Sequence, residues 1–302
     1  MNVIITGCSG FIGSHATRYF LARDHKVIGI DSSSAKNVDE FLKDGNFHLF
    51  KSDISFNLLL ERLDLEVDAI VHLAAFNSIP ESILHPHSFI KNNTMSMQML
   101  LEFAKLRNIK RFVYASSSSI MNSVPSPYSI SKQMNELQAK TYSIHYGLEA
   151  IGLRFFNIFG PKQKYKTPNS PVIPKLIYQL LKNEDIILRE PDRVSRDFTY
   201  VDNACQAIYK AATKEGLTQD VFNVGCGESV SLQEVFEFIR NNIRMSSSQV
   251  TNKSLRLGEK SFSKADISRT IDHLDYMPLV DWKTGVLRTI GWLNEEIKVP
   301  LV

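Results

Sequence analysis

The sequence predicts an α/β protein built on a doubly wound parallel sheet, followed by a smaller C-terminal domain. Two observations indicate this fold class. Short β-branched or aromatic runs alternate with helix-like segments through the first half of the chain, an order typical of parallel sheets. A glycine-rich turn also follows the first run directly, at the place where such sheets bind phosphate groups.

Six runs are predicted to form buried strands, at 3–6, 27–30, 47–50, 69–73, 112–115 and 151–155. Helix-like segments lie between most of them, at 11–23, 36–43, 56–63, 88–107 and 129–145. In the first segment, apolar side chains such as Phe11, Ala16 and Phe20 fall on one helical face. Each strand is therefore expected to lead through a helix into the next parallel strand.

The alternation loosens after Gly160, where prolines stand at 161, 168, 171 and 174 around the start of a helix predicted near 173–183. We expect a nucleotide-binding domain over 1–158 and a substrate-binding region over 159–302. Two later strand-like runs, FTYV at 198–201 and VFNV at 221–224, are expected to return to the first domain, so that strands near 198–224 interleave with its sheet.

Composition excludes several classes of function. The 302 residues carry a net charge of only +3 and their basic residues are scattered, so no nucleic acid partner is expected. The apolar start MNVIITG breaks at Gly7, too early for a signal peptide, and no stretch is long enough to suggest a membrane partner. Cys8, Cys205 and Cys226 fit neither a disulfide framework nor a zinc site. We expect a cytoplasmic protein without a metal.

The motif VIITGCSGFIGSHA favours dinucleotide binding. Its glycines follow the first strand and open the first helix, at Gly7, Gly10 and Gly13. Glycine allows a tight turn and a close approach to a pyrophosphate, which the free N–H groups of a helix N-terminus then bind. Asp31 ends the second strand about 20 residues on, where a carboxylate binds ribose hydroxyls and repels a 2′-phosphate. NAD is therefore favoured over NADP, with an ordinary glycine-rich turn as the alternative.

The stretch YASSSSIMNSVPSPYSISK, 114–132, follows the fifth strand and carries the candidate catalytic groups. Pro125 and Pro127 stand where a helix could begin, since proline is tolerated in its first turn. Tyr128 and Lys132 then lie one turn apart on one face. A lysine ammonium and a nicotinamide ring are expected to move the phenol pKa from about 10 toward the working pH. A serine hydroxyl orients the substrate hydroxyl. A plain surface loop explains these spacings less well.

Several motifs in order resemble those of the extended short-chain dehydrogenase/reductase family, specifically its nucleotide-sugar epimerases and dehydratases. They are TGCSGFIGSH, HLAA at 72–75, YASSSS, YSISK at 128–132, RFFNIFGP at 154–161, RDFTYVD at 196–202 and ADISR at 265–269. The resemblance covers essentially the whole chain and implies a Rossmann fold with bound NAD. The residues expected to line the cofactor, besides the glycines, Asp31, Tyr128 and Lys132, are Phe11, Ile12, Asp53, Ile54, Leu73, Ala74 and Ala75. A solvated loop carboxylate is the alternative for Asp53.

The resemblance aligns the catalytic hydroxyl with Ser117 and separates the possible reactions. Family dehydratases carry Asp-Glu at the next two positions, and decarboxylases carry a Glu at the second. Ser118 and Ser119 stand there in this chain and cannot supply those carboxylates. What the resemblance then implies is 4-epimerisation of a UDP-hexose, with Tyr128 as base and a transient 4-keto sugar.

Substrate contacts are also implied by the resemblance. Asn157 is expected at the diphosphate and Val172 at the uracil. Arg196 and Arg256 match two arginines that clamp the diphosphate, for which the guanidinium fork is suited, with structural ion pairs as the alternative for both. Ser263 stands where galactose-specific relatives have a bulky Tyr, so an N-acetyl group at C2 is expected to fit.

Two departures from the family leave alternatives open. Ser117 and Tyr128 are only eleven residues apart, which shortens a loop that usually walls the site, and REPD at 189–192 replaces a common YGDG. UDP-N-acetylglucosamine or its galacto epimer, UDP-glucose or galactose, and UDP-glucuronate all remain candidate substrates. A 4-ketosugar reductase and a non-catalytic NAD-binding sensor are the competing functions.

A homodimer is expected from the same resemblance. Apolar side chains in 93–106 occupy more than the narrow stripe that packing on a sheet requires. The helix from Tyr128 onward carries Ile130, Met134, Leu137 and Tyr142 in addition. In relatives these two helices pair with their copies across a two-fold axis. The alternative is that these side chains belong to the core of a single chain.

Overall fold

The computed structural model describes the chain except residues 34–35, 55–65, 168, 219, 244–247, 256–260 and 298–302. The chain divides into two compact units. The first comprises Met1–Phe155, Cys205–Asn223 and Ser268–Tyr276, and the second comprises Phe156–Ala204, Val224–Ile267 and Met277–Val302. The sequence placed the boundary at 158, with a later return to the first domain, and the first unit of the structure has its first break after Phe155. The chain returns to the first unit after residue 204, where the Tyr209 ring packs against Phe20 and Arg111 donates to the Ala211 carbonyl.

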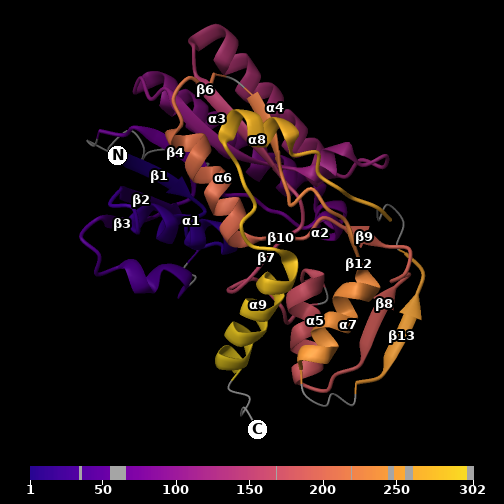
Figure 1. Ribbon diagram of the computed structural model, residues 1–302. Coiled ribbons are helices and arrows are strands. Elements are labelled where there is room, and N and C mark those ends of the chain that lie inside the picture. Colours follow the sequence, from indigo (N-terminus) through magenta and orange to yellow (C-terminus); the bar gives the residue numbers. More distant parts are fainter. Residues whose placement is uncertain are drawn as a thin grey trace. The chain divides into compact units, whose positions relative to one another are not determined.

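A seven-stranded sheet forms the centre of the first unit and confirms the predicted doubly wound parallel fold (Figure 1). Its strands are β1 (Asn2–Thr6), β2 (Lys26–Asp31), β3 (Phe47–Lys51), β4 (Ala69–His72), β5 (Arg111–Ser117), β6 (Glu149–Phe155) and β11 (Asp220–Val224). Their order is β11-β6-β5-β4-β1-β2-β3. The direction of winding reverses between β1 and β4, which pair in parallel. Nucleotides bind outside the carboxyl ends of strands at such a switch point.

Helices of the first unit lie between these parallel strands or, for the last of them, follow the final strand. They are α1 (Phe11–Leu21), the 3₁₀ helix η1 (Lys36–Phe41), α2 (Ile79–Leu84), α3 (Pro86–Leu106), the 3₁₀ helix η4 (Ser118–Met121), α4 (Pro127–Tyr146), most of α6 (Val201–Thr213) and α8 (Ser268–Leu274). The helix predicted at 36–43 is therefore a shorter 3₁₀ helix, and the one predicted at 56–63 lies outside the described residues. Buried side chains of α3 and α4, such as Met97, Leu100 and Tyr142, join β5 residue Phe112 in one core.

The N-terminus of α4 is fixed by a capping box. The Ser126 side chain accepts from the Ser129 backbone N–H at 3.1 Å, and the Ser129 hydroxyl in turn accepts from the Ser126 N–H at 2.8 Å. Of the two prolines expected near the helix start, Pro127 occupies the first helical position. These contacts satisfy donors that a helix start leaves free. The shortened segment before α4 therefore still ends in a defined helix start.

The second unit combines short strands with longer helices. Its elements are β7 (Ile158–Phe159), α5 (Val172–Leu181), β8 (Ile186–Arg189), β9 (Ser195–Arg196), β10 (Thr199–Tyr200), β12 (Val230–Ser231), α7 (Leu232–Asn242), β13 (Val250–Lys253) and α9 (Trp282–Ile297). The strands pair as β10-β7, β12-β9 and β13-β8, and α5, α7 and α9 pack together (Figure 1). The run at 198–201 was expected in the central sheet, which is wrong, because β10 pairs with β7. The run at 221–224 was also expected there, and it does join the central sheet, as β11.

In the part of the chain that the structure describes, no helix combines the length and the apolar composition that crossing a membrane requires.

Two glycines with the same left-handed backbone have different surroundings. Gly7 and Gly147 both have φ of +69°, a conformation that costs side-chain-bearing residues energy. Gly147 ends α4, and a Cβ built there meets no atom within 4 Å. A Cβ at Gly7 would lie 2.7 Å from the Ala74 nitrogen and 2.8 Å from its Cα. Backbone atoms therefore crowd the turn at Gly7, whereas the turn at Gly147 is open.

Gly7→Ala is predicted to destabilise the protein more than Gly147→Ala. The strain of a left-handed alanine, about 1–2 kcal/mol, is common to both variants. Gly7→Ala adds an overlap with backbone that cannot rotate away, which costs about 1–3 kcal/mol more. Urea unfolding of both variants measures this difference in the free energy of unfolding. Equal losses for the two variants would contradict the argument.

Candidate active site

The turn after β1 has no room for side chains where it meets α1. The Gly7 N–H donates to the Ile30 carbonyl at 2.8 Å, which holds the turn against β2. A Cβ on Gly13 would lie 2.0 Å from the Gly7 carbonyl oxygen, so α1 starts in direct contact with the turn. Gly10 is the N-cap of α1 and provides no side-chain hydrogen bond to its first N–H groups. These N–H groups can therefore bind a phosphate.

Asp31 lies beside this turn, at the carboxyl end of β2. Its Oδ2 accepts the Ser9 N–H at 2.9 Å and its Oδ1 accepts the Ser33 N–H at 2.8 Å. Each carboxylate oxygen can accept a further hydrogen bond. The carboxylate is thus held in one orientation while it keeps the capacity to bind the hydroxyls of a ribose.

The remaining residues expected at the cofactor also follow the ends of strands or open α1. Leu73, Ala74 and Ala75 come directly after β4, and the Ala74 N–H donates to the Thr6 hydroxyl at 3.3 Å. Phe11 and Ile12 form the partly exposed first turn of α1. Beyond β3, Asp53 is exposed and Ile54 is buried. Together with the crowded glycines and Asp31, this set fits a dinucleotide.

His72 is a buried neutral group at the end of β4. Its Nδ1 lies 2.8 Å from the Thr6 hydroxyl, and its Nε2 finds no hydrogen-bond partner among the described residues. Burial lowers the pKa of His72 to about 3, and the nearby Lys132 charge lowers it in the same direction. His72 therefore carries no charge that would compete with Lys132.

Ser117, Tyr128 and Lys132 come together where β5 ends and α4 begins. The Ser117 side chain hydrogen-bonds to Tyr128, and its oxygen accepts the Ser119 N–H at 3.2 Å. The Lys132 ammonium is buried and donates to the Ala115 carbonyl at 2.8 Å. The three side chains that the sequence singled out therefore share one corner of the first unit.

The pKa values of this corner differ from the expectation. Burial raises the pKa of the Tyr128 phenol above its ordinary value, and the hydrogen bond with Ser117 opposes this shift. Burial lowers the pKa of Lys132 to about 8. Lys132 was expected to lower the Tyr128 pKa, but within the protein itself the Tyr128 pKa is raised. Desolvation dominates, while Lys132 binds a backbone carbonyl.

Asn157 and Ser263, expected at different parts of a sugar nucleotide, contact each other in the second unit. The Asn157 side-chain N–H donates to the Asp197 carbonyl at 2.9 Å and to the Ser263 hydroxyl at 3.2 Å. Ser263 is only 8% exposed. Asn157 has a left-handed φ of +36°, which Asn tolerates better than most residues. The two positions therefore form one hydrogen-bonded pair.

The other substrate-contact candidates are less fully defined. Arg196 lies on β9 and donates to the Ser195 carbonyl at 2.9 Å. Asp197, the next residue, accepts the N–H groups of Cys226, Gly227 and Ala265, and Asp202 pairs with Arg288. Val172 opens α5 and is partly exposed. Arg256 lies outside the described residues.

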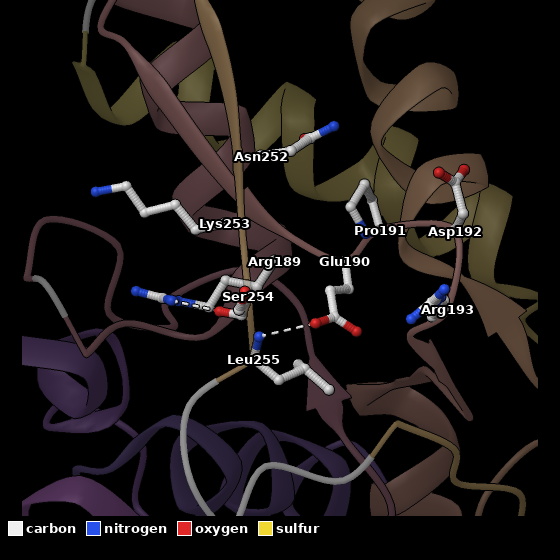
Figure 2. Close-up of a pocket in the computed structure, with 9 residues that line it drawn as sticks. All are labelled: Arg189, Glu190, Pro191, Asp192, Arg193, Asn252, Lys253, Ser254 and Leu255. Carbon is white, nitrogen blue, oxygen red and sulfur yellow. Dashed lines mark hydrogen bonds between the residues drawn. The ribbon is translucent and has the colours of Figure 1, made fainter.

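A pocket of about 820 Å³ lies beside the ends of β8 and β13 (Figure 2). Its lining is Arg189, Glu190, Pro191, Asp192, Arg193, Asn252, Lys253, Ser254 and Leu255. Arg189 donates to the Ser254 carbonyl at 2.7 Å, and Glu190 accepts the Leu255 N–H at 3.4 Å, so the two segments are tied together. Three cations and two carboxylates line this pocket, a balance that suits an anion. The segment REPD, which departs from the family, contributes four of its residues.

Sequence reasoning missed several polar residues around the catalytic corner. Thr6 and His72 stand within recognised motifs, but only the structure brings them together across β1 and β4. Glu136 lies one turn beyond Lys132 on α4 and binds Arg154 and Ser116. In the sequence, only the four-residue spacing from Lys132 could have indicated that Glu136 lies on the catalytic face of the helix. No group of His, Cys, Asp and Glu side chains in the described residues could hold a metal ion.

Comparison with known proteins agrees with this geometry. Residues 3–225 match the model of the NAD dependent epimerase/dehydratase family. An uncharacterized UDP-glucose epimerase, YtcB, from Bacillus subtilis is 31% identical over 317 residues, which cover 97% of this chain and 98% of the relative.

Two solved structures share the fold over nearly the whole chain. The UDP-N-acetylglucosamine 4-epimerase from Methanobrevibacter ruminantium M1, in complex with UDP-N-acetylmuramic acid, is 31% identical with a TM-score of 0.90, covering 98% of both chains. The UDP-glucuronic acid 4-epimerase from Bacillus cereus, with UDP-glucuronic acid and NAD, is 26% identical with a TM-score of 0.89, covering 98% of this chain and 100% of that one. This protein belongs to the NAD dependent epimerase/dehydratase family and uses NAD as its cofactor.

Proposed function

We propose that the protein is a cytoplasmic NAD-dependent 4-epimerase of a UDP-hexose that acts through a transient 4-keto sugar. The observation that carries the proposal is the grouping of Ser117, Tyr128 and Lys132 at the carboxyl edge of an NAD-binding sheet. Ser118 and Ser119, the next two residues, bring no carboxylate for elimination or decarboxylation. The remaining reaction is one that oxidises and then reduces a single carbon, which is 4-epimerisation.

Tyr128 is the proposed base for the C4 hydroxyl. The Ser117 oxygen accepts the Ser119 N–H, which leaves the Ser117 hydroxyl proton available for the phenolate. Donation of that proton stabilises the charged form of Tyr128. Bound NAD supplies a hydride acceptor and donor and a positive charge on its nicotinamide ring. Since burial raises the Tyr128 pKa, the rate is expected to rise with pH until the phenol has lost its proton. Lys132 holds a positive charge one turn away, and its ammonium would bind the nicotinamide ribose.

The second unit supports a nucleoside diphosphate as the part of the substrate that anchors the sugar and stays attached to it throughout the reaction. Asn157 and Arg196 match the family residues at the diphosphate, and the pocket beside β8 and β13 adds Arg189, Arg193 and Lys253. A guanidinium binds phosphate oxygens in pairs, which gives direction as well as attraction. We propose that the UDP portion binds to this unit.

Tyr128→Phe is predicted to abolish epimerisation while NAD stays bound. The variant removes only the phenolic oxygen, and loss of a general base costs on the order of 10²–10⁴-fold in rate. The cofactor is held elsewhere, by the glycine turn and Asp31. Turnover of UDP-sugars and the NAD released on denaturation together measure the two effects.

Tyr142→Phe is the matched control for this variant. Tyr142 lies on the same helix, but its hydroxyl donates to Glu102 and accepts from Gln98, away from the catalytic corner. Its loss is expected to leave kcat nearly unchanged. Near wild-type turnover by Tyr128→Phe would refute the assignment of the base.

The N-acetylated sugars are the proposed preferred substrates. Ser263 is small and largely buried, so no phenol fills the space that galactose-specific relatives close. The 31% identical UDP-N-acetylglucosamine 4-epimerase supports the same class of substrate. UDP-glucuronate is the second candidate, because the solved UDP-glucuronic acid 4-epimerase is 26% identical and Ser118 and Ser119 do not exclude a C6 carboxylate.

Ser263→Tyr is predicted to depress turnover of the N-acetylated pair selectively. The added phenol needs the volume that an acetamido group would occupy, which corresponds to a loss of roughly 10–200-fold in kcat/KM. UDP-glucose and UDP-galactose, lacking that group, are expected to lose much less. Ser263→Ala serves as the control, because it removes the hydroxyl without adding volume. Equal losses for both pairs of sugars in Ser263→Tyr would show that position 263 does not select the C2 group.

A homodimer through α3 and α4 is also proposed. The two helices pack on each other and leave apolar side chains exposed, namely Met95, Ile130, Met134, Leu137 and Ile144. Leu137 and Ile144 are 62% and 65% exposed. A two-fold axis would bring these same helices of two copies together and cover them.

Leu137→Lys is predicted to convert the dimer into a monomer. A buried ammonium without a partner would oppose association. Leu279→Lys is the control, since Leu279 is equally prominent at 67% exposed but precedes α9 rather than lying on α3 or α4. Sedimentation at micromolar concentration distinguishes the species. A wild-type mass of one chain would exclude the dimer.

A further inference from the structure

We propose that Glu136 is a positioning residue, which fixes α4 against the end of β5 and thereby holds Tyr128 and Lys132 in their working places. This inference rests on the proposed function, because the reaction assigns the work of Tyr128 and Lys132. It concerns a residue that does not itself touch the reacting atoms.

Glu136 binds two neighbouring strands at once. The Ser116 hydroxyl donates to its Oε1 at 2.6 Å. Arg154 donates from Nε to Oε1 at 2.8 Å and from Nη2 to Oε2 at 2.7 Å, a two-pronged pair. The Glu136 side chain is only 13% exposed, so water competes little for these bonds. Ser116 and Arg154 are direct neighbours in the register of β5 and β6.

These bonds continue the line of the catalytic contacts. Tyr128, Lys132 and Glu136 stand at intervals of four on α4 and therefore share one face of the helix. Their partners are three consecutive residues of β5, since Ser117 contacts Tyr128, Ala115 accepts from Lys132 and Ser116 donates to Glu136. The helix is attached to the strand at three successive turns, of which the third carries no proposed chemistry.

The effect of Glu136 is geometric rather than electrostatic. Arg154 neutralises its carboxylate at contact distance. Burial and the Ser117 hydrogen bond are the causes of the shifted Tyr128 pKa, and burial alone is the cause of the lowered Lys132 pKa. Glu136 therefore acts by setting how α4 lies on β5. A misplacement of about 1 Å at a catalytic group can cost on the order of 10²-fold in rate.

The chain offers a matched control in a second ion pair between the same strands. Arg111 and Glu149 pair at the opposite ends of β5 and β6, with contacts of 3.1 Å and 2.9 Å to one carboxylate oxygen. The Arg111 side chain is 10% exposed, and it also donates to the Ala211 and Lys214 carbonyls. This pair joins the two strands without a hydrogen bond to α4 among the described residues.

The test compares Glu136→Gln with Glu149→Gln in the full-length protein. In Glu136→Gln the new amide keeps the shape of the side chain but turns an N–H group toward the donors of Arg154. We expect kcat to fall roughly 10- to 100-fold, with KM changed less than about 2-fold and NAD content retained. We expect Glu149→Gln to keep kcat within about 2-fold. If kcat is retained in Glu136→Gln, or falls only together with NAD content, the positioning role is wrong.

Hydrogen–deuterium exchange separates this inference from the proposed function. In Glu136→Gln, amides of residues 129–135 are expected to exchange at least about 5-fold faster than in the wild type, and in Glu149→Gln they are expected to be unchanged. This measurement needs no substrate. A wild type that turns over no UDP-sugar would refute the proposed function, whereas unchanged exchange in Glu136→Gln would overturn the positioning role.

Discussion

Parallel pairing of the central strands is the constraint on which the site depends. When neighbouring strands run in one direction, all their carboxyl ends lie along one edge of the sheet, and every following turn starts there. Gly7 follows β1, Asp31 ends β2, Leu73 follows β4 and Ser117 ends β5. Residues separated by more than a hundred positions in the chain are therefore gathered by hydrogen bonding of the backbone alone.

Close approach of backbone to backbone then shapes the cofactor side of this edge. Gly13 is in contact with the Gly7 carbonyl, and Gly7 is in contact with Ala74. Because no side chain intervenes, α1 starts in direct contact with the turn after β1, and its first N–H groups receive no side-chain cap from Gly10. On the other side of the switch point, α4 is attached to β5 by side chains, so the cofactor turn and the catalytic helix are held by different kinds of contact.

Local patterns in the sequence predicted the strands of the sheet and the helices α1, α3, α4 and α5, because each has a long apolar run or a clear periodicity. The same patterns misplaced the run at 198–201, since a short apolar strand does not reveal its partner and β10 pairs with β7. The helices α2, α6, α7, α8 and α9 were not predicted. Contacts between distant side chains, such as Arg154 with Glu136, were also invisible, and so was the burial that raises the Tyr128 pKa. Such contacts depend on tertiary packing rather than on spacing.

The Asn157 side-chain amide links two positions of the second unit, the Asp197 backbone and the Ser263 side chain. One nitrogen donates both to the Asp197 carbonyl and to Ser263. Under the proposed function, Asn157 binds the diphosphate and Ser263 admits the C2 substituent. A substitution at position 157 or 263 then changes the effect that a substitution at the other position has on substrate binding. New sugar preferences in this lineage are accordingly expected to arise through paired substitutions, in an order that keeps Asn157 anchored at each step.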